Sequence, residues 1–524
     1  MIWHIFKKDA RLLWWLAASV AALDFAKITI LLELGLFPQN PRLYLLSQFL
    51  AVGELLGVGF AIAAVVQQDA IPGVRQDWLV RPIRRRDLLL AKLLFVVLML
   101  RLPSLLLNFY EGLSSGFRFE AALGSAVWGA LMLLLAVDIP FLAFASLTRN
   151  LLEAITGGVV IFFGAAILLT MTTGGGNRLM RQPTFGTGME WITAAAVTIL
   201  LLVFAAILLL LQFFRRRTFL SRCLTGVATV VGLLTTFIPW QPAFAIERSL
   251  SRVPGAAKTF ALSFNPGAGR FPRGPNLPAL NLLPAQELTF VFIPLQVFGL
   301  PQSGAIQSDH VEIRLVEANG RVDALNAYPQ SGFRASAELS RAPQSGTYQS
   351  VTLPATLYHR LKDQPIRVEI NYSLTLWQIG SSYALPATNA DEHIPGLAWC
   401  KTRVNGNETA VQLRCEQAGN QPGCVTAVLE HTPSGRHNPE RFNCEGSDYA
   451  PYPPWQFMPD QLHRFGANLS FRDEAGLASY PVDGSMLQDS RVIVHVYEPE
   501  EHFSRNLIIP GIRLRDWEAE SAPR

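Results

Sequence analysis

The feature that most constrains this chain is a series of long apolar runs in its first 240 residues. A helix needs roughly 20 mainly apolar residues to cross a bilayer, because lipid offers no partner for unpaired backbone groups. Seven segments meet this requirement, so the sequence predicts a membrane all-α bundle of about seven transmembrane helices. The expected spans are 12–35, 44–66, 90–109, 121–147, 151–172, 190–213 and 221–242.

Beyond these runs the composition changes. The whole chain is 50% hydrophobic and 16% charged, but from Glu247 onward polar residues and prolines interrupt every apolar stretch. Apolar residues there recur with a period of two, which is typical of strands. We therefore expect a transmembrane domain over 12–246 and an all-β, sandwich-like extracytoplasmic domain over 247–524. The clearest strand is Ile366, Val368, Ile370, Tyr372, Leu374 and Leu376, followed by Val311, Ile313 and Leu315, and by Val492, Val494 and Val496.

Residues 1–11 carry Ile2, Trp3, Ile5 and Phe6 among basic residues. This mixture predicts a cytoplasmic interfacial helix lying at the level of the lipid headgroups. The alternative is a plain cytoplasmic extension of the first span.

Basic residues in the connections predict the orientation, because Lys and Arg beside membrane spans are retained in the cytoplasm. An odd number of crossings then places the N-terminus inside and the β-rich domain outside, in the periplasm of a cell with an inner membrane. The net charge of +4 is small and lies beside apolar segments, so it does not indicate nucleic-acid binding. The basic side has Lys7, Lys8, Arg11, Arg75, Arg81, Arg84, Arg85, Arg86, Lys92, Arg149, Arg215, Arg216, Arg217 and Arg222; the opposite side has Arg42, Arg118, Arg178 and Arg181.

The cysteines agree with an exported domain. Four of the five lie between positions 400 and 444, which suggests two disulfides in an oxidising compartment. Three pairings are possible. Two apolar strands around residues 420–423 favour Cys415–Cys424, which leaves Cys400–Cys444. A zinc site and free buried thiols are the alternatives.

Charged residues inside the spans are costly and tend to be paired or to face a cavity. Asp24 and Lys27 share a helical face at i, i+3 and are expected to form an ion pair. Glu54 and Arg101 are expected to pair across the second and third spans, with Glu54 lining a translocation path as a further possibility. Asp138, close to Pro140, is expected to accommodate a kink.

The segment 67–92 is the most informative connection of the membrane half. It contains Asp69, Trp78, Leu79, Arg81, Pro82, Ile83, Leu88, Ala91 and Lys92. In that order these residues resemble the first cytoplasmic loop of type-2 permeases of ATP-binding-cassette (ABC) transporters. Val80 stands where the family usually has Thr, and Arg84, Arg85 and Arg86 make this loop more basic than its counterparts.

The resemblance implies that segment 67–92 is a coupling loop, whose short helix docks on a separate cytoplasmic ATPase. Trp78 and Leu79 suit an apolar anchor, and Arg81 to Arg86 suit an acidic partner surface. The alternative is that the arginines only contact anionic lipid headgroups. Lipid attraction accounts for the charge but not for the order of Trp, Leu, Arg and Pro.

The chain contains no G-x-x-x-x-G-K-[ST] phosphate-binding loop, so we expect it not to be an enzyme itself and to bind no cofactor. ATP and Mg²⁺ are expected on the partner ATPase, and a second permease subunit, identical or related, would complete the pathway. The resemblance thus implies a multi-pass exporter subunit in the cell membrane. The alternative is a non-transporting membrane anchor that displays a β-sandwich interaction domain. Ala243, Phe244 and Ala245 also resemble a signal-peptide cleavage site, although their place far into the chain favours a retained helix.

Overall fold

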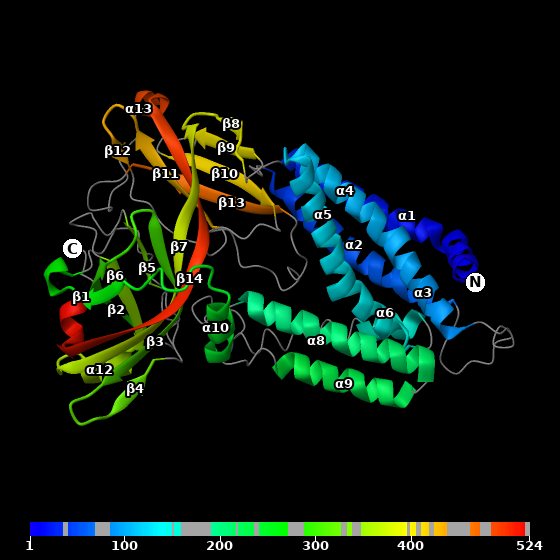
Figure 1. Ribbon diagram of the computed structural model, residues 1–524, viewed down its shortest axis with the longest axis horizontal. Coiled ribbons are helices and arrows are strands. Elements are labelled where there is room, and N and C mark those ends of the chain that lie inside the picture. The colour runs from blue at the N-terminus through cyan, green and yellow to red at the C-terminus, as the bar shows by residue number, and fades with distance from the viewer. Residues whose placement is uncertain are drawn as a thin grey trace.

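The computed structural model describes residues 1–34, 40–68, 84–148, 151–158, 190–215, 218–234, 240–270, 288–325, 333–337, 347–395, 399–404, 410–418, 424–437, 462–471 and 484–518. Over these residues the chain forms a helical region followed by a β-rich region, as expected from the change in composition. Figure 1 shows the helical bundle on one side of the molecule and the strands on the other, with α10 (Trp240–Ser249) between them.

The helical region is a series of long apolar helices. Five of the described helical stretches are long and apolar enough to cross a membrane: Ile2–Leu34, Pro41–Gln67, Arg85–Ser114, Phe119–Ala145 and Ala196–Arg215. Many of their large apolar side chains are exposed, such as Phe49 and Leu56, which suits contact with lipid rather than water. The elements are α1 (Ile2–Leu34), α2 (Pro41–Gln67), α3 (Arg85–Phe95), η2 (Val96–Arg101), α4 (Leu102–Ser114), α5 (Phe119–Leu133), η3 (Leu134–Asp138), α6 (Ile139–Ala145), α8 (Glu190–Leu210), η5 (Leu211–Arg215) and α9 (Thr218–Leu234).

Three of the seven predicted spans lie partly outside the described residues, and the span expected at 12–35 does so only at its last residue, Gly35. Of the span expected at 151–172, only 151–158 are described, and they are helical. Of the span expected at 221–242, α9 covers 17 residues to Leu234, and α10 begins at Trp240. The predicted count of seven therefore stays a prediction.

The first helix differs from the predicted division at residue 11. α1 runs without interruption from Ile2 to Leu34, and Ile5, Phe6 and Asp9 are buried within the bundle. Trp3 in the same segment is 57% exposed, so its apolar residues pack on protein only in part. The helix is continuous with the first span, and the interfacial position of residues 1–11 stays a prediction.

The described residues of the β-rich region form three antiparallel sheets. Their strand orders are β1-β2-β6, β13-β10-β9-β8, and β12-β11-β14-β7-β3-β4 with β5 beside β3. The strands are β1 (Ala261–Phe264), β2 (Leu288–Phe298), β3 (Gly304–Val316), β4 (Val322–Ala324), β5 (Arg334–Ser336), β6 (Thr347–Pro354), β7 (Ile366–Pro386), β8 (Asp391–His393), β9 (Trp399–Val404), β10 (Val411–Ala418), β11 (Cys424–His431), β12 (Arg436–His437), β13 (Leu462–Leu469) and β14 (Ser490–Ile512). Short helices α12 (Ala355–Leu361) and α13 (Gly484–Gln488) and the turns η7 (Pro266–Ala268) and η8 (Leu514–Trp517) lie between or after them.

Two long strands hold this region together. β7 and β14 pair along almost their whole length, from Arg491 opposite Pro386 to Ile512 opposite Ile366. The predicted alternation in β7 is confirmed, since Val368, Ile370 and Leu374 are fully buried. The first part of β7 packs in one core with β2, β3 and β6, and its end packs in another with β9, β10 and β11.

The favoured disulfide pairing is wrong. Cys400 is bonded to Cys415, because β9 and β10 are antiparallel neighbours and these two residues lie directly opposite each other, with their Cα atoms 4.1 Å apart. Cys424 also forms a disulfide, but it lies on β11 in a different sheet from β10. The predicted hairpin between Cys415 and Cys424 therefore does not form. Cys444 lies outside the described residues, and Cys223 is free and exposed.

The turn between α4 and α5 approaches the β-rich region closely at Gly116. Gly116 has a φ of +83°, and a Cβ atom built there would lie 1.8 Å from Nε1 of Trp399 on β9. The close approach and the left-handed backbone each exclude a side chain at this position. The turn and β9 therefore pack through a contact that only glycine permits.

We expect Gly116→Ala to lower the thermal midpoint of the detergent-solubilised protein. The left-handed backbone alone costs roughly 1–2 kcal/mol with a side chain, and the displaced indole adds to this. Gly226→Ala is the matched control, because a Cβ atom on that α9 glycine meets nothing within 4 Å. Equal midpoints for the two variants would show that the contact between Gly116 and Trp399 does not form.

Candidate functional site

The buried charges of the helical bundle form the candidate functional site. The first group links α1 to α2. Nζ of Lys27 lies 2.9 Å from Oδ1 of Asp24 and 2.6 Å from Oε2 of Glu54. The predicted ion pair between Asp24 and Lys27 is thus confirmed. Glu54 joins the same ammonium group, so two carboxylates share one cation among apolar helices.

The second group joins η2 to η3. The Arg101 guanidinium donates from Nε and Nη2 to both carboxylate oxygens of Asp138, and both side chains are almost fully buried. The partner of Arg101 is therefore Asp138, where the sequence suggested Glu54. A planar fork on a carboxylate is the strongest geometry that such a pair can adopt, which favours it over a single contact with Glu54.

Both members of this pair end a π-helical segment, and a proline follows two residues later. Pro103 and Pro140 have no N–H to offer to the carbonyls of Met99 and Ala136. Those carbonyls lie within η2 and η3, where the wider turn replaces the regular α-helical bonding. The sequence predicts a kink near Asp138, and the structure has a π-helical turn that ends at this residue. The same irregularity occurs in the facing helix, so the two distorted turns meet at the ion pair.

The third group lies near the start of α1. Nζ of Lys92 on α3 donates to Oδ2 of Asp9 at 2.7 Å, and both side chains are inaccessible to solvent. The sequence does not predict this pair, because Asp9 lies within a basic segment that was expected to lie at the membrane surface. The only available signal was an acidic residue among Lys7, Lys8 and Arg11.

The predicted docking residues fall mostly outside the described part of the chain: Asp69, Trp78, Leu79, Arg81, Pro82 and Ile83 all lie within 69–83. The three arginines that follow are described. Arg84 is exposed at the N-terminal cap position of α3, Arg85 donates to the carbonyl of Phe214 at 2.7 Å, and Arg86 is largely exposed beside Asp87.

Several contacts gather the basic connections at one end of the bundle. Gln67 at the end of α2 bonds Thr148 at 2.8 Å, and Arg222 at the start of α9 contacts the Leu147 carbonyl at 3.3 Å. Together with the bond from Arg85 to Phe214, these contacts place the ends of α2, α6 and η5 beside the starts of α3 and α9. Figure 1 shows the β-rich region at the opposite end, beside the turn between α4 and α5.

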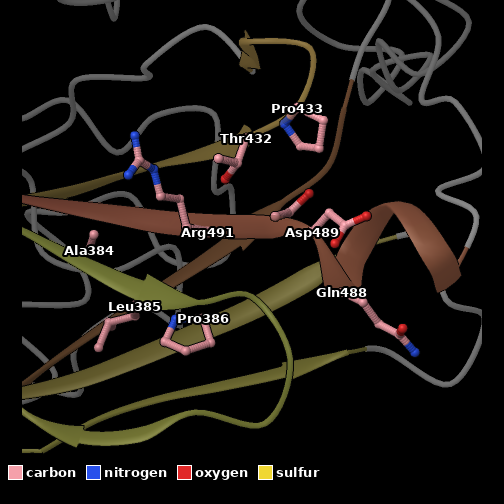
Figure 2. Close-up of a pocket in the computed structure, with 9 residues that line it drawn as sticks. Ala384, Leu385, Pro386, Thr432, Pro433, Gln488, Asp489 and Arg491 are labelled. Atoms are coloured by element: carbon pink, nitrogen blue, oxygen red, sulfur yellow. The ribbon is translucent and has the colours of Figure 1, made fainter.

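An open surface depression lies on the β-rich region. It lies where β7 ends and β14 begins, and Figure 2 shows Arg491, Asp489 and Gln488 spread around it. Arg491 is paired across the strands with Glu430 at 3.1 Å, so its charge is engaged. The remaining lining is divided between apolar and polar side chains, with Asp489 as its one other charged residue, and this mixture indicates no particular chemistry. It is lined by Ala384, Leu385, Pro386, Thr432, Pro433, Gln488, Asp489, Ser490 and Arg491.

The described residues thus form a membrane-type bundle that contains three groups of buried ion pairs. One end of the bundle is basic, and the opposite end contacts the β-rich region. Comparison with known proteins adds no identification: no family model, curated protein or solved structure gives a significant match to this chain.

Proposed function

We propose that this chain is the membrane-spanning permease subunit of an ABC transporter, most suited to export, and that a separate cytoplasmic ATPase drives it. The order of residues in segment 67–92 supports this assignment, since Trp78, Leu79, Arg81 and Pro82 suit a docking helix better than a lipid contact. On this proposal the bundle has seven spans, the N-terminus is cytoplasmic, and the β-rich domain is a sandwich outside the membrane.

The observation that carries the proposal is the buried pair of Lys92 and Asp9. α3 begins at Arg85, within the arginine-rich part of segment 67–92, and Lys92 binds it to α1 through a salt bridge that excludes water. Breaking such a pair costs about 3–5 kcal/mol, so α1 and α3 are expected to move together. A force on the segment would therefore reach the first helix of the bundle, as coupling to an ATPase requires.

The buried charges deeper in the bundle support a moving part rather than an inert anchor. The ion pairs around Lys27 and Arg101 lie in apolar helices, where charged residues are costly. Helices whose sole role was to anchor the chain in lipid would need no such residues. The π-helical turns at η2 and η3 are frequent at functional sites and allow helices to adjust their register. A second permease subunit, identical or related, would complete the pathway.

The docking role is tested by a double variant, Trp78→Ala with Arg81→Glu. We expect this variant to lose co-purification with the cytoplasmic ATPase that the unmodified protein retains, because the apolar anchor disappears and the electrostatic attraction is reversed. Arg118→Glu is the matched control: it makes the same charge change at the exposed N-cap of α5, near the opposite end of the bundle. Membrane insertion is checked for both by size-exclusion chromatography in detergent.

Retention of the ATPase by a correctly inserted double variant, with unaltered coupling of ATP hydrolysis, would contradict the proposal. It would favour the alternative of a membrane anchor that displays the β-rich domain, because an anchor has no need of a docking helix.

A further inference from the structure

α10 connects the helical bundle to the β-rich region, and its first residue is fixed on the sheet. Trp240 stacks on the ring of His310, with the ring centroids 4.5 Å apart, and its Nε1 donates to Oε1 of Glu312 at 3.0 Å. Both partners belong to β3, on the face away from the apolar core. The helix therefore begins on a polar surface of the sheet, and its later turns remain close to β14.

At the other end of α10, three potential metal ligands meet. Glu247 of α10, Asp309 of β3 and His502 of β14 each offer one ligand atom, and these atoms all lie within 4.8 Å of one another. Nδ1 of His502 is 4.0 Å from Oε2 of Glu247, and both side chains are largely shielded from solvent. The three residues come from segments far apart in the sequence, so only the packing of α10 on the sheet brings them together.

The backbone explains how the two strand residues reach the same place. The pairing of β3 with β7 shifts between Ser308 and His310, so Asp309 is the extra residue of a β-bulge. A bulge redirects a side chain that regular pairing would place elsewhere, and bulges are frequent beside functional sites. The Thr375 hydroxyl on β7 lies 2.7 Å from both Oδ2 of Asp309 and Nδ1 of His502, and it holds these two groups in position.

The donor set resembles that of a transition-metal site. Zn²⁺ binds imidazole nitrogen and carboxylate oxygen at about 2.0–2.2 Å, so two ligand atoms of a tetrahedral site lie about 3.4 Å apart. The three ligand atoms lie within 4.8 Å of one another, so side-chain rotations that draw them together by up to about 1.4 Å complete the site. An imidazole ligand favours Zn²⁺ over Ca²⁺ or Mg²⁺, which prefer oxygen alone.

We propose that Glu247, Asp309 and His502 bind one Zn²⁺ ion that fastens α10 to the sheet formed by β3, β7 and β14. Three protein ligands leave a fourth position for water. The Thr375 hydroxyl supports the site by orienting Asp309, in the way that outer groups orient the ligands of known zinc centres. This inference does not rest on the proposed transport function, because all four residues lie beyond the candidate spans of the bundle.

The test measures Zn²⁺ binding by the full-length protein, purified in detergent without a polyhistidine tag and freed of metal with a chelator. Competition with a chromophoric chelator is expected to give one Zn²⁺ per chain, together with a higher thermal midpoint. Co²⁺ in the same site is expected to give the visible absorption of a four-coordinate ion. Glu247→Gln, Asp309→Asn and His502→Ala should each weaken binding at least tenfold and abolish the rise in midpoint, and Thr375→Val should weaken it about 10- to 100-fold.

The chain supplies a matched control on the same pair of strands. His495 of β14 contacts Ser382 of β7 through Nδ1 at 2.7 Å, and no metal-ligand group among the described residues includes it. His495→Ala should therefore leave Zn²⁺ binding unchanged. Absence of stoichiometric Zn²⁺ binding, or equal affinity in Glu247→Gln and the unmodified protein, would overturn the proposal. The near-isosteric Glu247→Gln and Asp309→Asn variants decide the question if His502→Ala does not fold.

Discussion

Asp138→Asn is expected to be the most damaging single replacement considered in the bundle. The variant keeps the shape of the side chain but leaves the Arg101 guanidinium without a counter-charge at a site where both side chains are at most 6% exposed. Removing one partner of a buried ion pair costs about 3–5 kcal/mol. The measurement is the thermal midpoint of the detergent-solubilised protein, followed by fluorescence-detected size exclusion.

A double variant and a control separate charge from packing in this prediction. Arg101→Met with Asp138→Leu removes both charges and should recover most of the lost stability, because apolar residues of similar volume often replace a buried pair without cost. The control, Glu153→Gln, removes the ion pair between Glu153 and Arg222. The Arg222 side chain is 47% exposed and that of Glu153 is 42% exposed. That exposed pair is worth only about 0–1 kcal/mol. If Asp138→Asn were no worse than Glu153→Gln, the Arg101 pair would not be a buried contact.

The second large effect is expected in the β-rich region on loss of the disulfide between Cys400 and Cys415. The bond closes a chain segment with a sequence separation of 15, and a loop of that size is worth about 3 kcal/mol in the chain-entropy account. Cys400→Ser with Cys415→Ser should lower the denaturant midpoint of the oxidised protein accordingly. Cys223→Ser removes a free, exposed thiol and should change nothing.

Peptide mapping of the oxidised protein gives an independent check on this pairing. A fragment that joins Cys400 to Cys415 is expected, because the two residues face each other across β9 and β10. A fragment that joins Cys415 to Cys424 would contradict the strand register, since β10 and β11 belong to different sheets.

The interpretation of the buried charges depends on where they lie relative to the basic end. Asp9 and Lys92 lie near that end, whereas the groups around Lys27 and Arg101 lie farther along the same helices. A movement of α3 would shift α1 through the pair of Lys92 and Asp9, and with it the group around Lys27. It would reach the Arg101 pair through η2, which continues α3. This order is what the proposed permease requires, and it makes the Arg101 pair a natural position at which the helices shift.

The sequence by itself determined the class of each half. The apolar runs and the alternation in β7 are local patterns. The hydrophobic effect buries the apolar face of such a segment, and this holds whichever other segment covers that face. The pair of Asp24 and Lys27 was predictable for the same reason, since i, i+3 residues on one helix meet in any fold.

The tertiary structure decided the long-range pairings, because these depend on which distant segments become neighbours. Arg101 and Asp138 are separated by 37 residues and meet only because η2 faces η3. Cys400 meets Cys415 because β9 lies beside β10, whereas spacing alone suggested a hairpin to Cys424. Glu247, Asp309 and His502 meet only where α10 crosses the sheet beside a bulge. A charge or thiol has no periodicity of its own, so its partner is set by packing and not by its place in the sequence.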